Sequence, residues 1–477
     1  MNTNRREFLK RLAILPVAAG TAGCGALPGG DPTSVRTDLP GRSESSPDPE
    51  STPQQRTIEE LALEWGFDGV VDLQEEGADA TGSVSIDDIL ERHVGDDALV
   101  FLPRGRYLID GTVGADGVDR VGIVGDRATL VPQDGNEDTI LTFGWPDPVG
   151  SALLSGVTFD FNAVDTGGRP VQIAASDRLL IEDVAVSGEA DVPQDLFRVD
   201  VTDPDGAGVV RRLYLPDGAP GDTKVTGCEV GDENHGELSF LDCEIDGFPD
   251  NGLYANPPEG TVNVIGGRYL NNGVAGVRIE VAEDAVIRGV HVRCDDAEGG
   301  GENMRGIRLR NGHSVLVEDC FVEMLEVTSS DGAITFSSEL ESATVRNTLI
   351  HVDADDVNAL RFKNASTEAA RAGPFVCEGI TITGSAGEGA AIQASGRDNV
   401  TLRNICMYQP GFDRDGIHAD DISGEFVDSH ISVTGYPFVV RDSSFPRRNV
   451  VVHEDTENPT TNMNGSCGST VTESRFR

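Results

Sequence analysis

A short phrase recurs along the chain from about residue 150, and its spacing constrains the fold more than any other feature. The phrase reads apolar-x-apolar-x, then Asp, Asn or Gly, then x-x-apolar, and no long helical pattern interrupts it. Its Asp, Asn and Gly positions are Asp183, Asp242, Gly266, Gly289, Asp319, Asn347, Gly379, Asn404 and Asp428. After Asp242 the spacings are 24, 23, 30, 28, 32, 25 and 24 residues, and the 59-residue gap before it leaves room for at least one more repeat. This period with strand-like patterning predicts a coil of about three short strands per turn.

The recurrent Asp, Asn or Gly predicts a corner in every coil, where the backbone needs a positive φ or a side-chain-to-backbone hydrogen bond. Stacked coils bury each strand between its neighbours, and a solenoid grows by adding repeats. The 477 residues therefore need not form two or three separate domains. We expect an all-β chain, a single-stranded right-handed parallel β-helix (solenoid) with a short N-terminal helical cap.

The start of the globular region supports this fold class. Short helices are predicted at 58–65 and 86–93, and the segments 77–82 (GADATG) and 100–109 (VFLPRGRYLI) lie between and after them. These residues resemble the opening of pectate-lyase-like β-helix proteins, in which a GAxxTG loop and a helix precede a V-x-L-P-x-G-x-Y-x-I strand. The resemblance covers roughly 70–110 and implies architecture, because this fold carries many unrelated activities. We assign 58–145 to the cap and first coils, and 146–477 to the β-helix.

The first 57 residues are predicted to lie outside the fold. Residues 4–10 (NRREFLK) resemble a twin-arginine export signal, and the apolar run 12–19 is too short to span a bilayer. The signal, 1–24, ends in TAGC, which resembles a lipobox with Cys24 as the lipidated residue; a simple cleaved signal is the alternative. Residues 25–57 are rich in Pro, Ser, Asp and Gly and predict a disordered tether. We therefore expect export by the twin-arginine pathway and lipid anchoring to the membrane at the cell surface.

The charge of the chain limits its partners. With 37 Lys and Arg against 81 Asp and Glu, the net charge is -44. A polyanion of this kind repels nucleic acid. The charge favours solubility in concentrated salt, where screening removes self-repulsion. The composition, with only three lysines, resembles that of halophilic archaeal proteins.

Seven cysteines follow Cys24, so they cannot all pair with one another. None forms a C-x-x-C pair, which argues against a structural zinc site. Most lie in apolar strand patterns, which predicts buried small hydrophobic residues and leaves the disulfide pairing open.

A second phrase in each repeat is a strand whose alternation sends two parallel files of side chains outward. The first file is Tyr254, Arg278, Arg308, Thr335, Arg361, Ile392 and His418. The second file is Asn256, Glu280, Arg310, Ser337, Lys363, Ala394 and Asp420. The same alternation sends Leu253, Val277, Ile307, Ile334, Leu360 and Ile417 inward.

A basic face on so acidic a protein has two interpretations. Turns stack about 4.8 Å apart, so these cations lie within one or two turns of one another and repel unless anions bridge them. In the first interpretation Glu280 and acidic loops supply the anions, and the face is a salt-bridged sheet. In the second, the face is a groove for an acidic polysaccharide, whose uronate or sulfate oxygens take bidentate hydrogen bonds from arginine.

A groove of this kind could support β-elimination. Lys363, crowded by arginines, would act as the base or proton donor, while Arg308, Arg310 and Arg361 would hold the uronate carboxylate. The expected substrate-binding residues are Tyr254, Arg278, Glu280, His418 and Asp420. No cofactor is certain, but pectate lyases commonly use Ca²⁺, and Glu280 and Asp420 are possible ligands.

Hydrolysis is the alternative chemistry, and it needs paired carboxylates. Polygalacturonase-like enzymes carry, in order, Asn-Thr-Asp, Asp-Asp, Gly-His-Gly and Arg-x-Lys motifs. This chain has Asp250-Asn251-Gly252, Asp295-Asp296, Gly312-His313-Ser314 and Arg361-Phe362-Lys363 in that order, a partial resemblance. The rival class is a non-catalytic surface, adhesion or envelope protein, which needs none of these motifs.

Overall fold

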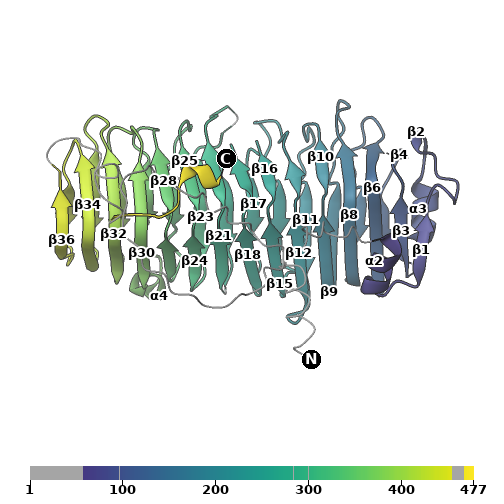
Figure 1. Ribbon diagram of the computed structural model, residues 1–477, viewed down its shortest axis with the longest axis horizontal. Coiled ribbons are helices and arrows are strands. Elements are labelled where there is room, and N and C mark those ends of the chain that lie inside the picture. The colour runs from purple at the N-terminus through teal and green to yellow at the C-terminus, as the bar shows by residue number, and fades with distance from the viewer. Residues whose placement is uncertain (1–56, 96, 283, 299, 454–466, 477) are drawn as a thin grey trace, which may run out of the picture.

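The computed structural model describes residues 57–95, 97–282, 284–298, 300–453 and 467–476. They form a right-handed parallel β-helix of about 13 turns, seen from the side in Figure 1. The pairings run between successive turns and are parallel, as between β17 and β20. This confirms the expected fold class. The predicted export signal, the tether up to residue 56 and Cys24 lie outside the described residues.

Each complete turn contributes to three sheets. The first sheet contains β5 (Val113–Ala115), β7 (Leu141–Phe143), β11 (Phe197–Val201), β14 (Cys228–Val230), β17 (Asn251–Ala255), β20 (Ala275–Glu280), β23 (Arg305–Asn311), β26 (Gly332–Phe336), β29 (Asn358–Phe362), β31 (Ala390–Ser395), β33 (Asp415–Asp420) and β35 (Phe438–Arg441). The second contains β1 (Gly69–Asp72), β3 (Ala98–Leu102), β12 (Ala207–Arg211), β15 (Glu237–Leu241), β18 (Thr261–Ile265), β21 (Ala285–Arg288), β24 (Val315–Glu318) and β27 (Ala343–Arg346). The third contains β2 (Thr81–Ser85), β4 (Arg106–Ile109), β10 (Ala185–Ser187), β13 (Tyr214–Leu215), β16 (Glu244–Asp246), β19 (Arg268–Leu270), β22 (His291–Cys294), β25 (Phe321–Met324) and β28 (Leu349–Val352).

Some longer strands bend round a corner and serve two sheets. β9 (Val171–Glu182) joins the first sheet to the second. The strands that join the second sheet to the third are β6 (Arg120–Pro132), β8 (Val149–Asp160), β30 (Phe375–Thr383), β32 (Val400–Gln409), β34 (Gly424–Val433) and β36 (Arg447–Val452).

The corner between the second and third sheets is the predicted Asp, Asn or Gly position. All nine positions of the recurring phrase have positive φ, from 48° at Asn347 to 66° at Gly266. Arg212, with φ 52°, supplies the extra corner inside the 59-residue gap. Asn side chains also bond along the corner, since Asn449 donates to Asp428 at 2.9 Å. Left-handed backbone favours these residue types, so the sequence pattern has a direct local cause.

The N-terminal end is closed by helices. α2 (Ile58–Trp65) and α3 (Asp87–His93) match the two predicted helices to within one residue. The α2 helix begins with a capping box between Thr57 and Glu60. Its Trp65 packs on apolar side chains of the second sheet, including Leu153. One further short helix, α4 (Glu368–Ala372), lies between β29 and β30.

Inside the coil, side chains stack in ladders from turn to turn. The rings of Phe336 and Phe362 stack with centroids 4.0 Å apart, and Phe375 meets both edge-on. Five cysteines are buried and free, as expected for small hydrophobic residues.

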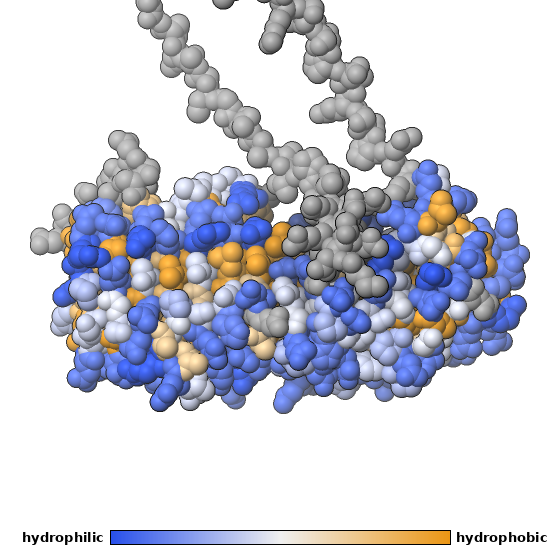
Figure 2. Space-filling view, turned by 90° about the horizontal axis from the view of Figure 1, so that it is seen from below, coloured by the Kyte–Doolittle hydropathy of each residue, from blue (hydrophilic) through white to orange (hydrophobic). Residues whose placement is uncertain are grey.

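Seen from below, the surface is mainly hydrophilic, with orange hydrophobic residues between the polar ones (Figure 2). None of the helices in the described parts of the chain has the length and hydrophobicity of a transmembrane span.

The last residues fold back along the outside of the coil. A disulfide joins Cys406 to Cys467, and the short helix η1 (Glu473–Arg475) follows near β25 (Figure 1). On the way, the backbone N–H of Thr470 donates to the Asn347 side chain at 2.7 Å. The ring of Phe476 ends 5.8 Å from that of Phe321, so the tail covers part of the third sheet.

Candidate functional site

The outward file on the first sheet exists as expected over its central turns. Strand register aligns Tyr254 with Arg278, Arg278 with Arg308, Arg308 with Thr335, and Thr335 with Arg361. Because each step is one turn, about 4.8 Å, the three arginines share one narrow strip of surface.

The expected alignment is wrong by one residue on β31. Ile392 points into the core and is fully buried, and Gln393 takes its place beside Arg361 in the outward file. In the second file Ser395, rather than Ala394, aligns with Asp420. A register shift in the same file aligns Glu280 with Asn311 rather than with Arg310. The segment begins Ala-Ala-Ile, so neither alternation period nor polarity fixes its register.

Glu280 neutralises one part of the basic face. Its carboxylate accepts from Arg278 at 2.8 Å and lies 3.4 Å from Nε of Arg310. The Tyr254 hydroxyl donates to it at 3.2 Å, and the guanidinium of Arg278 stacks 4.1 Å above the Tyr254 ring. These four residues form a compensated, ordered cluster, which fits the salt-bridged interpretation.

Asp331 neutralises a second part. It binds Arg305 at 2.8 Å, Asn303 at 2.7 Å and the ammonium group of Lys363. Burial opposes the charged form, but the hydrogen bonds from these three side chains lower the pKa of Asp331 to about 2. Alternation within the strands does not reveal Arg305 or Asp331. The available signal is their place just before the aligned strand phrases: Arg305 is one residue before Gly306, and Asp331 is two residues before Ala333.

Arg308 and Arg361 are different, because no carboxylate among the described residues forms an ion pair with either. Within the described part of the chain, the buried Nε of Arg308 has no hydrogen-bond partner, and the one hydrogen bond of the Arg361 side chain goes to the carbonyl of Phe362 at 3.4 Å. Burial, and then the neighbouring cations led by Arg305, lower the pKa of Arg308 to about 10. Burial also lowers the pKa of Arg361. Between them in the outward file, Thr335 is fully buried and carries no charge.

A buried arginine, which the strand alternation does not reveal, holds the loops beside this pair. The side chain of Arg397 donates to the carbonyls of Lys363 at 2.7 Å and Leu340 at 2.8 Å, and to those of Ser337 and Ala370. It is fully buried, and burial lowers its pKa to about 10. Arg397 thus holds the loop after β26 and the loop after β29 together, and so fixes the backbone position of Lys363.

Toward the N-terminus the same face becomes acidic. Glu229 follows Arg198 in the outward file, and Asp250 lies directly before the next strand, β17. Burial, reinforced by Asp195, raises the pKa of Glu229. Burial also raises the pKa of Asp250 although Arg278 opposes it, and Asn251 donates to its carboxylate at 2.9 Å. Carboxyl groups that hold a proton more firmly therefore adjoin the arginines.

The structure does not bring His418 and Asp420 next to the arginines. They lie on β33, two turns beyond Arg361 on β29. His418 is hydrogen-bonded to Asp415 at 2.7 Å. Glu280 and Asp420 are five turns apart, about 24 Å, so they cannot hold one Ca²⁺. The described part of the chain contains no group of three or more His, Cys, Asp or Glu placed to hold a metal.

The segments of the partial hydrolase resemblance are also dispersed. Asp295 and Asp296 follow β22 in the third sheet, where Asp295 pairs with Arg293 at 2.6 Å. His313 is exposed beside Glu341. The motifs that contain Asp250, His313 and Lys363 adjoin strands of the first sheet, β17, β23 and β29 respectively, whereas Asp295 and Asp296 do not.

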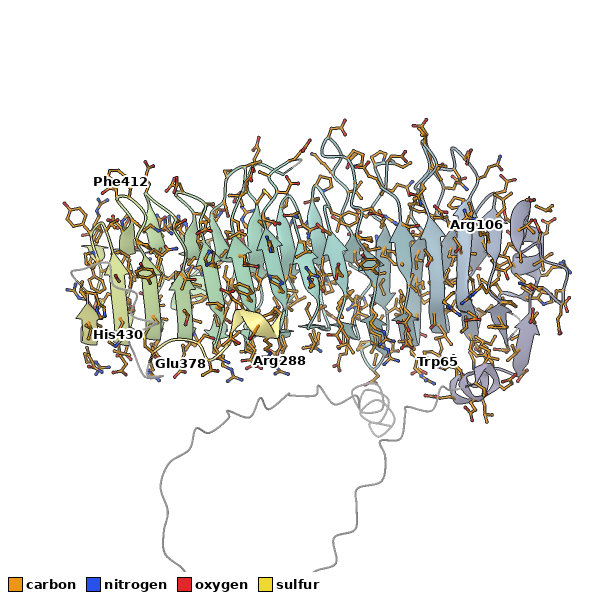
Figure 3. All side chains as sticks on the ribbon, turned by 45° about the horizontal axis from the view of Figure 1, so that its top comes forward. Trp65, Arg106, Arg288, Glu378, Phe412 and His430 are labelled. Carbon is orange, nitrogen blue, oxygen red and sulfur yellow. A yellow bond between two sulfur atoms is a disulfide. The ribbon has the colours of Figure 1, made fainter. Side chains whose placement is uncertain are left out.

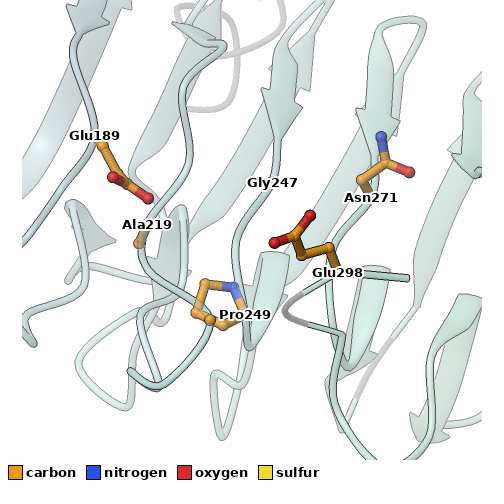
Figure 4. A pocket seen from close by; sticks show the side chains of 7 residues that line it. Glu189, Ala219, Gly247, Pro249, Asn271 and Glu298 are labelled. Carbon is orange, nitrogen blue, oxygen red and sulfur yellow. The ribbon is translucent and has the colours of Figure 1, made fainter. Parts of the chain in front are cut away.

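A pocket of about 400 Å³ lies among the loops that lead from the third sheet to the first (Figure 4). Its lining residues are Glu189, Ala219, Gly221, Gly247, Pro249, Asn271 and Glu298. In Figure 4 the carboxylates of Glu189 and Glu298 lie on opposite sides of it. The pocket is thus acidic and adjoins the loop that carries Asp250.

Together, the coil and its outward files define a right-handed parallel β-helix protein with a mixed-charge face. No protein-family model matches the chain, and no curated protein matches it. Among solved structures it is similar to PfbA, a surface adhesin of Streptococcus pneumoniae, at 12% identity and a TM-score of 0.47, over 80% of this chain and 93% of that one.

Two enzymes are similar at the same level. The A-module of the mannuronan C-5 epimerase AlgE4 of Azotobacter vinelandii matches at 10% identity and a TM-score of 0.36, over 85% of this chain and 100% of that one. The catalytic unit of a GH87 α-1,3-glucanase of Streptomyces thermodiastaticus matches at 14% and 0.40, over 81% and 68%. These likenesses concern the fold alone.

Proposed function

We propose that this protein is exported, anchored at the cell surface, and binds an anionic, uronate-containing polysaccharide along the first sheet. The observation that carries the proposal is the pair Arg308 and Arg361, two partly buried cations without an ion-pair partner in the described chain, on a protein of charge -44. A carboxylate or sulfate bound between them supplies the missing counter-charge through charge-assisted hydrogen bonds.

We propose β-elimination as the reaction, with hydrolysis as the alternative. A base removes the proton beside the uronate carboxyl, a double bond forms there, and the glycosidic oxygen leaves with its electron pair and takes up a proton. Arg308, Arg310 and Arg361 neutralise the carboxylate as the carbanion character develops. Lys363 is the proton-transfer group, after substrate displaces its ammonium group from Asp331.

The test uses protein lacking residues 1–24 in multimolar salt, with uronate-containing and sulfated polysaccharides. Ultraviolet absorbance of unsaturated uronate and the number of reducing ends are followed together. Absorbance that rises with reducing ends supports elimination, and reducing ends alone support hydrolysis. Full lyase activity in Lys363→Ala would remove Lys363 from the mechanism.

A non-catalytic binding function has one observation in its favour. The resting ammonium of Lys363 is bound to Asp331, so in this structure it already has a partner and is not free to take part in proton transfer. Tight binding with neither product signal, with and without added Ca²⁺, would support an adhesion or envelope role over catalysis.

The anchor is tested separately. Cells that produce the Cys24→Ser variant should release the protein into the medium, whereas wild-type protein should partition with membranes. Equal membrane partition of both proteins would contradict lipidation at Cys24.

A further inference from the structure

Two aromatic side chains stand almost fully in solvent at the C-terminal end of the coil. The exposed fraction is 81% for Phe412 and 71% for Tyr436. Figure 3 shows Phe412 projecting outward from its loop. Both belong to loops that lead from the third sheet to the first, before β33 and β35 respectively. Exposed aromatic rings forgo the favourable free energy of burial, so a ligand that covers them recovers it.

The loops that carry these rings are tightly held. The fully buried Arg414 donates to the carbonyls of Val357 at 2.6 Å and Glu388 at 2.7 Å, and to the Gln409 side chain at 2.8 Å. The Thr434 hydroxyl accepts from the backbone N–H of Arg414 at 3.0 Å and so joins one loop to the other. The exposed rings are therefore presented by an ordered backbone.

A single carboxylate connects these loops to the outward file. Asp415 is hydrogen-bonded to the His418 ring at 2.7 Å, and its other oxygen accepts from the backbone N–H of Tyr436 at 2.6 Å. His418 lies two turns beyond Arg361 in the same file, a distance of about 10 Å. The aromatic loops thus flank a continuation of the arginine strip.

We propose that Phe412 and Tyr436 form a second subsite, in which they stack on the apolar ring faces of the polysaccharide held by Arg308 and Arg361. This inference rests on the proposed function and adds the direction and length of the bound chain. The polymer runs along the coil axis, with charged groups on the arginines and C–H faces on the aromatic rings. From β23 to β35 there are five steps, about 24 Å, which is about five sugar residues.

The test is binding of defined oligogalacturonates, a dimer and an octamer, to soluble protein in high salt by calorimetry. Phe412→Ala with Tyr436→Ala should weaken octamer binding at least tenfold and dimer binding less than twofold. Leu63→Ala is the matched control, since this apolar side chain is 80% exposed on the distant α2 helix. It should change neither affinity.

Other outcomes distinguish the two ideas. If the wild-type protein binds neither oligomer, the proposed function for this substrate class and the subsite are both wrong. If binding depends on Arg308 but the double aromatic variant keeps full octamer affinity, only the subsite is wrong. Light scattering gives a third outcome. If the double aromatic variant keeps octamer affinity but is a monomeric protein where the wild-type protein is dimeric, the rings form a contact between two copies of the chain, and the subsite is again wrong.

Discussion

Arginines line both the first sheet and the edge of the second, yet the two regions treat them differently. On the second sheet, Arg288 and Arg346 lie on either side of Glu318 and both bond to it, Arg288 at 2.5 Å. On the first sheet, Arg308 and Arg361 lie on either side of Thr335, which carries no charge. Both rows are aligned from strand to strand, but the middle residue is an anion in one row and uncharged in the other.

The comparison teaches that a row of cations on a coil is not by itself a site. The paired arginines are about half exposed, at 47% and 52% of the side chain, where water already screens them. Arg308 and Arg361 are more buried, and a buried charge without an ion-pair partner has a higher free-energy cost than an exposed one. The paired arginines on the second sheet therefore contribute to stability. The arginines on the first sheet, Arg308 and Arg361, are the ones to which a ligand anion would supply the missing partner.

The largest expected effect separates the two rows directly. Arg308→Gln with Arg361→Gln should weaken binding of a uronate polysaccharide at least a hundredfold, because two charge-assisted contacts are lost. The free energy of unfolding should stay equal or rise by about 1 kcal/mol, because repulsion is removed. Titration calorimetry and chemical denaturation measure the two quantities.

The matched control is Arg288→Gln with Arg346→Gln, which should leave affinity within twofold. If this control weakens binding as much as the first double variant, the contrast between the rows has no functional meaning.

The acidic neighbour of the arginines should tune the affinity by pH. Burial raises the pKa of Asp250, so its negative charge disappears as pH falls through that raised value. Binding of a sulfated polysaccharide, whose charge does not titrate there, should strengthen several-fold over this interval. Asp250→Asn should bind about threefold to tenfold more tightly at neutral pH and show a smaller pH response. An unchanged pH profile in Asp250→Asn would contradict the role of this carboxyl.

Breaking the paired row should affect stability rather than binding. Burial raises the pKa of the Glu318 carboxyl, but hydrogen bonds from Arg288 and Arg346 outweigh it and lower this pKa below its usual 4.5. A carboxyl with a lowered folded pKa stabilises above its unfolded pKa and loses this contribution as pH falls through the folded value. Glu318→Gln should therefore cost about 1 kcal/mol at neutral pH and progressively less below pH 4.5, measured by denaturation at several pH values. A cost that persists at low pH would point to packing instead.

The smallest effect is expected at an isolated exposed pair. Arg106 meets Asp160 at 2.7 Å, but its side chain is 54% exposed. Arg106→Gln should change the free energy of unfolding by less than about 0.5 kcal/mol. A loss as large as that of Glu318→Gln would show that exposure does not govern these pairs.

Much of the fold was predictable because its causes are local. Corner residues such as Asp183 and Asn347 carry positive φ through their own side-chain chemistry, so their spacing gives the coil. Arg212 occupies an equivalent corner without a favourable residue type, which is why the pattern skips that turn. The register of β31 fails for a related reason, since Ala391 and Ile392 offer no polar contrast.

The candidate site was predictable only in part. Alternation places Arg308 and Arg361 outward, because period two is a property of the strand itself. Whether each cation has an anion depends on loops, and Asp331 reaches Lys363 from the turn before β26. Arg397 acts from inside a loop, where no strand pattern could reveal it.

The back-folded C-terminal tail changes how the coil can come apart. In a one-dimensional stack, terminal repeats have a single neighbour and fray first. Here Cys406 and Cys467, 61 residues apart in sequence, are covalently joined, and Thr470 reaches back to Asn347. The outermost turns are thereby enclosed in a loop whose far end is fastened several repeats inward. Reduction should therefore convert one cooperative melting transition into sequential loss of turns from that end.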